Sequence, residues 1–198
     1  MKKIGLTGGI GMGKSRAGEF ISEFGLPVLD TDQIARDVVQ PGMPALNEIR
    51  GDFGSDSILE NGQLNRSWLA RRVFGDDEAR KRLEAILHPK IRNQWELDLH
   101  QWVEQGHRVG VVIIPLLFET KAESEFDSVI CVACSSICQL ERLRKRAWAD
   151  KEIQQRIQSQ LPIQEKMDRS DYVVWNDGGV AVLKEQLQIL LGFQSFEE

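Results

Sequence analysis

The chain has 198 residues, 41% of them hydrophobic and 28% charged, with a formal net charge of −5. This length predicts one α/β domain with room for a small inserted lobe, and the acidic balance argues against a nucleic-acid partner. Because no apolar run is long enough to cross a membrane and no signal peptide is recognisable, we expect a cytoplasmic protein without a membrane partner.

The first predicted elements are a short strand at 4–7, a glycine-rich loop and a helix over 14–24. The loop reads Gly-Gly-Ile-Gly-Met-Gly-Lys-Ser from Gly8 to Ser15, which fits the phosphate-binding pattern G-x-x-x-x-G-K-[ST]. Glycines let backbone N–H groups turn toward phosphate oxygens, and the positive end of the helix points to the same place. In such a loop Lys14 reaches the β- and γ-phosphates of ATP, and the Ser15 hydroxyl is placed to bind Mg²⁺.

A second short strand, 27–29, leads into Asp30, Thr31 and Asp32. Ligands of open α/β sheets bind at the carboxyl ends of the strands, so these carboxylates should face the γ-phosphate. Phosphoryl transfer to an alcohol needs a group that orients the hydroxyl and accepts its proton, and we predict that Asp32 has this role. The other aspartate would act through a Mg²⁺-bound water. The alternative interpretation is a helix cap, because aspartate is a favoured N-cap residue.

Residues 32–109 carry almost no strand pattern. Helices are expected at 44–52, 66–74 and 77–105, and Pro89 is expected to kink or split the last of them. We interpret this region as a helical insertion between two strands of the sheet.

The strand pattern then resumes at 109–114, 126–133 and 172–175, with helices predicted at 136–148, in the charged segment to Met167, and at 180–192. The predicted fold is a P-loop NTPase-type three-layer α/β sandwich with a five-stranded parallel sheet. We expect a single kinase domain with a core of 1–31, 109–141 and 168–198, a helical acceptor-binding insertion at 32–108 and a helical lid at about 142–167.

Three cysteines, Cys131, Cys134 and Cys138, lie near the fourth predicted strand. The first two have the spacing of a metal knuckle, but a structural zinc site needs four ligands and no second pair or nearby histidine is visible. We therefore interpret the cysteines as small apolar residues on a buried strand and its exit.

The pattern of motifs favours a small-molecule kinase. The Asn-Lys-x-Asp base reader of GTP-binding switches does not occur in the chain. The basic run around Arg142 and Arg146 is either a solvated helix face or a clamp over ATP, and these two arginines are four residues apart and should share a helix face. Two alternatives stay open: another metabolite or nucleotide kinase, and a nucleotide-binding regulator without transfer activity.

Nearly the whole chain resembles the dephospho-CoA kinase family. The phosphate loop alone would not separate this family from other kinases, whereas the His-Pro-x-Ile, Pro-Leu-Leu-Phe-Glu and Gln-x-x-Arg elements are more specific. The matching positions are Gly5–Gly11, Gly13–Ser15, Asp30–Asp32, Ile34–Arg36, Pro41–Gly42, Phe53–Gly54, Val73–Phe74, His88–Pro89, Ile91, Pro115–Glu119, Gln139, Arg142, Leu143, Arg146, Gln160, Lys166, Asp171 and Asn176.

The resemblance implies that ATP phosphorylates the ribose 3′-hydroxyl of dephospho-CoA, which is the last step of coenzyme A biosynthesis. The expected catalytic residues are Asp32, Lys14 and Arg142. The expected ATP contacts are Gly11, Met12, Gly13, Lys14, Ser15, Arg16, Arg142, Arg146, Asn176 and Gly178. The acceptor would be bound by Asp32, Arg36 and His88, and Mg²⁺ by Ser15. We expect a monomer or weak homo-oligomer.

The chain departs from the family pattern at four places. Met12 replaces the usual serine of the loop, Thr31 replaces an alanine, and Arg16 stands where a small residue is common. The segment after Arg146, Ala147–Asp150, is shorter than usual and lacks the common Arg-Asp-Gly start, which leaves the lid contacts open. Because the Met12 side chain should point away from a backbone cradle, we expect little effect of that change.

Overall fold

A computed structural model describes residues 1–192 of the chain. The chain divides into two compact units, one formed by Met1–Asp30 together with the chain from Trp102 onward, and the other by Thr31–Gln101. The assignment of a core, an acceptor-binding insertion and a lid as functional parts stays a prediction.

The first unit is built on a five-stranded sheet with the order β2-β3-β1-β4-β5, in which every pair of neighbours is parallel. The strands are β1 (Lys2–Gly8), β2 (Val28–Asp30), β3 (Val109–Ile113), β4 (Ser128–Ala133) and β5 (Tyr172–Trp175). The central strands are buried on both faces, which explains why their sequences are nearly continuous apolar runs. The predicted five-stranded parallel sheet is confirmed.

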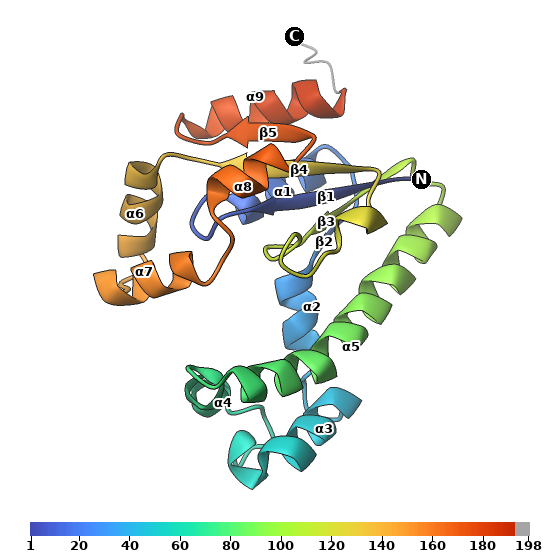
Figure 1. Ribbon diagram of the computed structural model, residues 1–198. Coiled ribbons are helices and arrows are strands. Elements are labelled where there is room, and N and C mark those ends of the chain that lie inside the picture. Colours follow the sequence, from blue (N-terminus) through green and yellow to red (C-terminus); the bar gives the residue numbers. More distant parts are fainter. Residues whose placement is uncertain (193–198) are drawn as a thin grey trace. The chain divides into compact units, whose positions relative to one another are not determined.

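Helices cover both faces of this sheet. Helices α1 (Lys14–Glu23) and α9 (Val180–Leu191) contact each other and pack on one face (Figure 1), where Phe20, Ile21 and Leu187 join the main apolar core. Helix α8 (Ile163–Asp168) contacts β1 and β4, and its Met167 packs against the apolar cluster that contains Ala133. Ala133 alternates with Val132, which belongs to the main core, so α8 covers the opposite face. The three-layer arrangement is the predicted one.

The segment between β4 and β5 is more broken than its sequence suggested. The predicted helix 136–148 ends early, as α6 (Ser136–Arg144), and the helix α7 (Asp150–Gln158) follows after a turn. Within this turn Ala147 has φ 58°, a left-handed conformation that no helix can continue through. The Arg144 guanidinium makes two hydrogen bonds to the Asp150 carboxylate, at 2.9 and 3.1 Å, and so closes the turn.

The second unit is helical, as its sequence predicted. It contains α2 (Thr31–Asp37), α3 (Pro44–Phe53), the 3-10 helix η1 (Ser55–Ser57), α4 (Arg66–Val73) and most of α5 (Asp77–Glu104). Pro89 lies inside α5, so it does not split the last helix; the alternative, that it kinks the helix, stays a prediction. Buried residues on both sides of it, Ala79 before and Trp95 and Leu99 after, hold the two halves in helical conformation despite the missing N–H.

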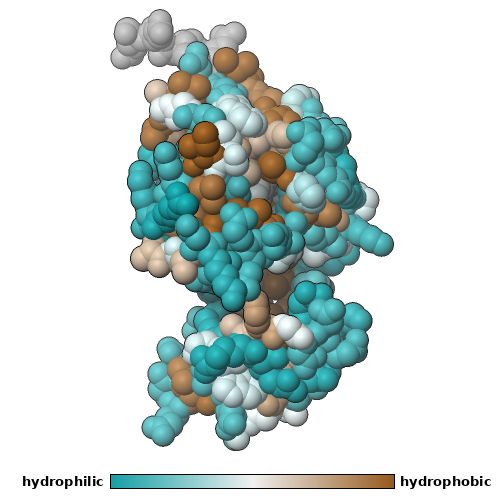
Figure 2. Space-filling view, turned by 60° about the vertical axis from the view of Figure 1, so that its left-hand side comes forward, coloured by the Kyte–Doolittle hydropathy of each residue, from teal (hydrophilic) through white to brown (hydrophobic). Residues whose placement is uncertain are grey.

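The surface is mixed in character. On the face drawn in Figure 2, hydrophilic residues cover much of the molecule and apolar residues lie between them. Within residues 1–192, none of the helices combines the length and the apolar content that a membrane span requires.

Candidate active site

The glycine loop between β1 and α1 follows a path that favours glycine at several places, of which Gly8 and Gly13 are the most restrictive. Gly8 and Gly13 have φ angles of 145° and 104°, in the region that other residues rarely adopt. A Cβ atom on Gly13 would lie 2.1 Å from Nδ2 of Asn176, and one on Gly8 would lie 2.1 Å from the Val132 carbonyl oxygen. The loop therefore lies in direct contact with the ends of β4 and β5. A side chain at Gly8 or Gly13 would displace the loop.

Positive charge and N–H donors meet at this loop. The Lys14 ammonium donates hydrogen bonds to the carbonyl oxygens of Gly8, at 2.7 Å, and Gly9, at 3.0 Å. Helix α1 begins at Lys14, so the first N–H groups of that helix have no intrahelical acceptor and carry the positive end of the helix dipole. A lysine beside such a helix start is an arrangement that binds phosphate.

Two glutamines, Gln139 on α6 and Gln160 after α7, hold the tip of the loop. Nε2 of Gln139 donates to the Ile10 carbonyl at 2.8 Å, and the Ile10 N–H donates to Oε1 of Gln160 at 3.0 Å. Gln139 is almost fully buried, at 6% exposure. The sequence predicts no individual role for either residue. Their only signal was membership in the resembling pattern, because pairing with a backbone some 130–150 residues away cannot be recognised from local spacing.

A second connection joins the loop to the segment after β5. Nδ2 of Asn176 donates to the Met12 carbonyl at 2.9 Å, and the Asn176 carbonyl accepts from Nη2 of Arg142 at 2.7 Å. The Met12 side chain is buried beside Ala133 and Cys134, so only its backbone can face a ligand. The adenine contact predicted for Asn176 stays a prediction, but its side chain has a clear structural role in bracing the phosphate loop.

The two arginines that we expected to clamp ATP are separated by the early end of α6. Arg142 lies within the helix and is half-buried against Asn176. Arg146 lies beyond the helix end, exposed, with its guanidinium 5.8 Å from the centre of the Trp148 ring. The prediction that they share a helix face is therefore wrong, because Arg146 is not part of the helix.

An open hollow of about 750 Å³ lies between α1 and the ends of β2 and β3. Ser15, at the start of α1, and Asp30, at the end of β2, are among the residues that line it. Oxygen ligands of this kind suit Mg²⁺, which is usually held by one or two protein groups together with substrate phosphates. The residues present therefore fit the cation that phosphoryl transfer requires.

The other residues predicted for the site are all exposed. Arg16 forms an ion pair with Glu19 at 2.6 Å, and its guanidinium lies 4.5 Å from the centre of the Phe20 ring. Gly178 lies in the loop between β5 and α9. In the helical unit Asp32 lies in the first turn of α2. The two other acceptor candidates are Arg36, near the end of α2, and His88, within α5.

Comparisons with known proteins decide the family. The family model described as dephospho-CoA kinase matches residues 2–182. The dephospho-CoA kinase of Bdellovibrio bacteriovorus is 44% identical over 177 residues, which cover 89% of this chain and 88% of the relative. The chain belongs to the dephospho-CoA kinase family. It is therefore a kinase of coenzyme A biosynthesis, and this membership decides against the two alternatives that the motifs left open.

Solved structures agree with this assignment. The protein TT1252 from Thermus thermophilus is 31% identical and superposes with a TM-score of 0.85, over 96% of either chain. The dephospho-CoA kinase from Campylobacter jejuni is 27% identical, with a TM-score of 0.71 over 97% of this chain and 96% of that one. The fold of this family member is thus the fold of solved relatives along nearly its whole length.

This dephospho-CoA kinase family member has a buried ion pair between α8 and the segment after β3. Lys166, on α8, is fully buried, and its ammonium lies 2.7 Å from Oε1 of Glu119 and 2.8 Å from the Pro115 carbonyl oxygen. The same Glu119 oxygen accepts the N–H of Leu161 at 2.9 Å, directly after Gln160. This pair therefore fixes the connection between α7 and α8.

The three cysteines are free thiols in different surroundings. Cys131 and Cys134 are buried and Cys138 is half-exposed. Burial raises the pKa of Cys131 and of Cys134 to about 11, because desolvation disfavours the thiolate. The interpretation as apolar residues fits Cys131, but Cys134 and Cys138 also approach the carboxylate of Asp177, a grouping that their spacing did not predict.

These surroundings predict an order of alkylation. At pH 7.5 iodoacetamide should modify Cys138 first and give a single adduct by intact mass, because the other two thiols are buried and protonated. In the Cys138→Ala variant the first adduct should appear much more slowly. Equal early labelling of all three cysteines in the folded wild-type chain would contradict the assigned burial.

Proposed function

We propose that this enzyme transfers the γ-phosphoryl group of ATP to the ribose 3′-hydroxyl of dephospho-CoA, giving coenzyme A and ADP. The observation that carries the proposal is the glycine loop, in which the Lys14 ammonium and the start of α1 offer charge and N–H donors at one place. Family membership supplies the acceptor, since the loop by itself would serve any phosphoryl acceptor.

The phosphate end of ATP would be held from three sides. Backbone N–H groups of Gly11–Arg16 would face the phosphate oxygens, and Lys14 would exchange its loop carbonyl partners for the β- and γ-phosphates. Arg142 would neutralise charge that develops during transfer, with Arg146 joining it when the lid closes. The segment from Asn176 to Gly178 would lie near the adenine.

Ser15 would hold Mg²⁺, with Asp30 acting directly or through a bound water. Both residues line the same open hollow beside the loop, and both offer oxygen ligands. When bound, the cation neutralises charge on the β- and γ-phosphates.

The acceptor hydroxyl would be oriented and deprotonated by Asp32, two residues beyond the end of β2. Arg36, also on α2, and His88 would contact the remainder of dephospho-CoA. The helical unit also contains a hollow of about 420 Å³ lined by polar and apolar residues, among them Asn65, Arg66 and Leu64. The Arg66 guanidinium donates to the Arg36 carbonyl at 3.4 Å, which connects this hollow to one of the proposed acceptor residues.

We further propose that the enzyme acts in the cytoplasm as a monomer or weak homo-oligomer. The three free thiols support a reducing compartment, where cysteines are kept reduced. Sedimentation at several protein concentrations would measure the assembly state, and a tight dimer at nanomolar concentration would contradict this part of the proposal.

The test of the function is ADP release with Mg-ATP and a set of acceptors. Dephospho-CoA should release ADP stoichiometrically with coenzyme A, which mass spectrometry identifies. Coenzyme A is the matched control, because its 3′ position is already phosphorylated and it should release none. ADP release with a nucleoside or nucleotide but not with dephospho-CoA would overturn the proposed acceptor.

Lid closure over ATP gives a separate prediction. The end of α6 and the turn after it expose Arg144, Lys145 and Arg146, all sites of trypsin cleavage. Closure of the lid around nucleotide should slow cleavage within 142–166, because the turn would be held against the phosphates. Limited proteolysis with Mg²⁺ alone and with Mg-ATP measures this, and identical cleavage rates in the two conditions would count against closure.

A further inference from the structure

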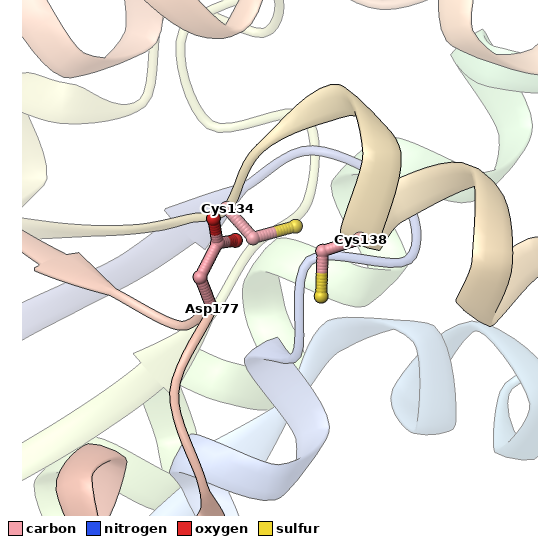
Figure 3. A group of neighbouring side chains, drawn as sticks. All are labelled: Cys134, Cys138 and Asp177. Atoms are coloured by element: carbon pink, nitrogen blue, oxygen red, sulfur yellow. The ribbon is translucent and has the colours of Figure 1, made fainter.

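Three potential metal ligands from separate segments gather at the edge of the sheet (Figure 3). Cys134 follows the last residue of β4, Cys138 lies in the first turn of α6, and Asp177 lies in the loop between β5 and α9. One sulfur from each cysteine and one carboxylate oxygen all lie within 4.8 Å of one another. Two sulfurs on one tetrahedral zinc ion are separated by about 3.8 Å, given the zinc–sulfur bond length, so only small side-chain movements would bring these atoms onto one ion.

Hydrogen bonds to the backbone already hold two of these residues, Asp177 and Cys138. Oδ1 of Asp177 accepts the N–H of Ser135 at 2.7 Å, which fixes the carboxylate. The Ser135 hydroxyl in turn accepts the N–H of Cys138 at 3.3 Å and caps α6, while the Cys138 thiol lies 4.0 Å from the Asn176 carbonyl oxygen. Outer hydrogen bonds of this kind hold metal ligands in place and are part of functional metal sites.

The chemistry of the three ligands determines which kind of metal ion they would bind. Two thiols and one carboxylate suit a thiophilic divalent ion, whereas Mg²⁺ prefers oxygen alone. Cys134 is buried, but Cys138 is half-exposed and Asp177 is exposed, so a fourth position would be open to water. We propose that Cys134, Cys138 and Asp177 form a three-ligand site for a thiophilic divalent cation, of which Zn²⁺ fits best.

This site is distinct from the proposed Mg²⁺ position but is connected to the phosphate loop. Asp177 directly follows Asn176, whose side chain braces the Met12 carbonyl and whose own carbonyl accepts from Arg142. An ion on Asp177 and the two cysteines would link the ends of β4 and β5 to the start of α6. Ion binding should therefore stabilise this region and reduce movement of the segment that supports the loop.

The experiment is a Co²⁺ titration of the full chain, kept reduced with a non-thiol reductant and free of Mg²⁺. Co²⁺ bound by thiolates gives a sulfur-to-metal charge-transfer absorption in the near ultraviolet. The wild-type chain should develop this band with one Co²⁺ per chain, and Zn²⁺ should abolish it by displacement. The Cys138→Ala variant should give no band, and Asp177→Asn should bind at least about tenfold more weakly, since losing even an outer partner of a ligand costs 10–100-fold.

Cys131→Ala is the matched control, because Cys131 is a buried cysteine outside the cluster and this variant should keep the band. Thermal unfolding gives a second measurement: Zn²⁺ should raise the Tm of the wild-type chain and leave that of Cys138→Ala unchanged. A wild-type chain without the band, or a band of equal strength in Cys138→Ala, would overturn the proposed site; the second result would mean that the ion binds elsewhere.

Discussion

Replacing Asp32 by asparagine should lower kcat with dephospho-CoA by about 100- to 10,000-fold, the usual contribution of a positioned general base. Asparagine keeps the size of the side chain and can still accept a hydrogen bond, but it cannot take up the proton of the acceptor hydroxyl. The residue is exposed, in the first turn of α2, so the change should leave the fold intact. ATP binding, measured by equilibrium titration, should be unchanged because the loop around Lys14 is untouched.

The matched control for this variant is Asp37→Asn, on the same helix. Asp37 is also an exposed carboxylate, and it accepts a hydrogen bond from Gln33 at 2.9 Å, but it is five residues further along and faces another direction. Its replacement should change kcat by less than about twofold, as expected for a surface substitution away from the chemistry.

Two further variants separate the possible roles of the carboxylates. If Asp32→Ala loses turnover but Asp32→Asn retains it, the residue only orients the hydroxyl and the proposed proton transfer is wrong. Asp30→Asn should instead raise the Mg²⁺ concentration needed for half-maximal rate, because Asp30 shares the hollow with Ser15. If Asp30→Asn loses turnover even at saturating Mg²⁺ while Asp32→Asn stays active, the two roles are reversed: Asp30 would be the base, and Asp32 would act on the cation.

Local sequence was sufficient to predict the sheet and the phosphate loop. The strands are apolar runs whose burial on both faces leaves little choice of structure, and the loop is encoded in eight consecutive residues. The glycine requirement at Gly13 could be anticipated, but not that Asn176 is the neighbour that enforces it. That contact joins residues 163 positions apart, and only the packed sheet brings them together.

The features that sequence reasoning missed depend on such long-range packing or on weak local signals. The end of α6 depends on a left-handed Ala147, and alanine ordinarily favours helix, so nothing marked the break. Proline usually breaks or kinks a helix, yet α5 continues through Pro89 because the burial of residues on both sides outweighs the lost hydrogen bond. In the sequence only Cys131 and Cys134 have the spacing of a metal knuckle, whereas the fold groups Cys134 with Cys138 and with Asp177, which follows β5.

We expect the free energy of unfolding to be most sensitive to substitutions in the buried pair of Lys166 and Glu119. In Lys166→Met the Glu119 carboxylate loses its cation, and its Oε2 atom already has no hydrogen-bond partner among the described residues. Removing one partner of a buried pair costs up to about 3–5 kcal/mol of unfolding free energy, and here the Glu119 carboxylate, 19% accessible, would keep only the Leu161 N–H as a partner for its charge. Urea unfolding of the variant should show this as a large drop in midpoint at unchanged slope.

Lys184→Met provides the matched control, because Lys184 makes an exposed ion pair with Glu23 at 2.8 Å, with side chains 40% and 49% accessible. Such a surface pair contributes about 0–1 kcal/mol, so the same substitution there should have little effect. The double variant Lys166→Met with Glu119→Leu should recover part of the loss, since no charge is then left buried. Equal destabilisation by Lys166→Met and Lys184→Met would contradict the burial of the pair. Because Glu119 also accepts the Leu161 N–H, next to the glutamine that holds Ile10, surviving Lys166→Met protein should also bind ATP more weakly.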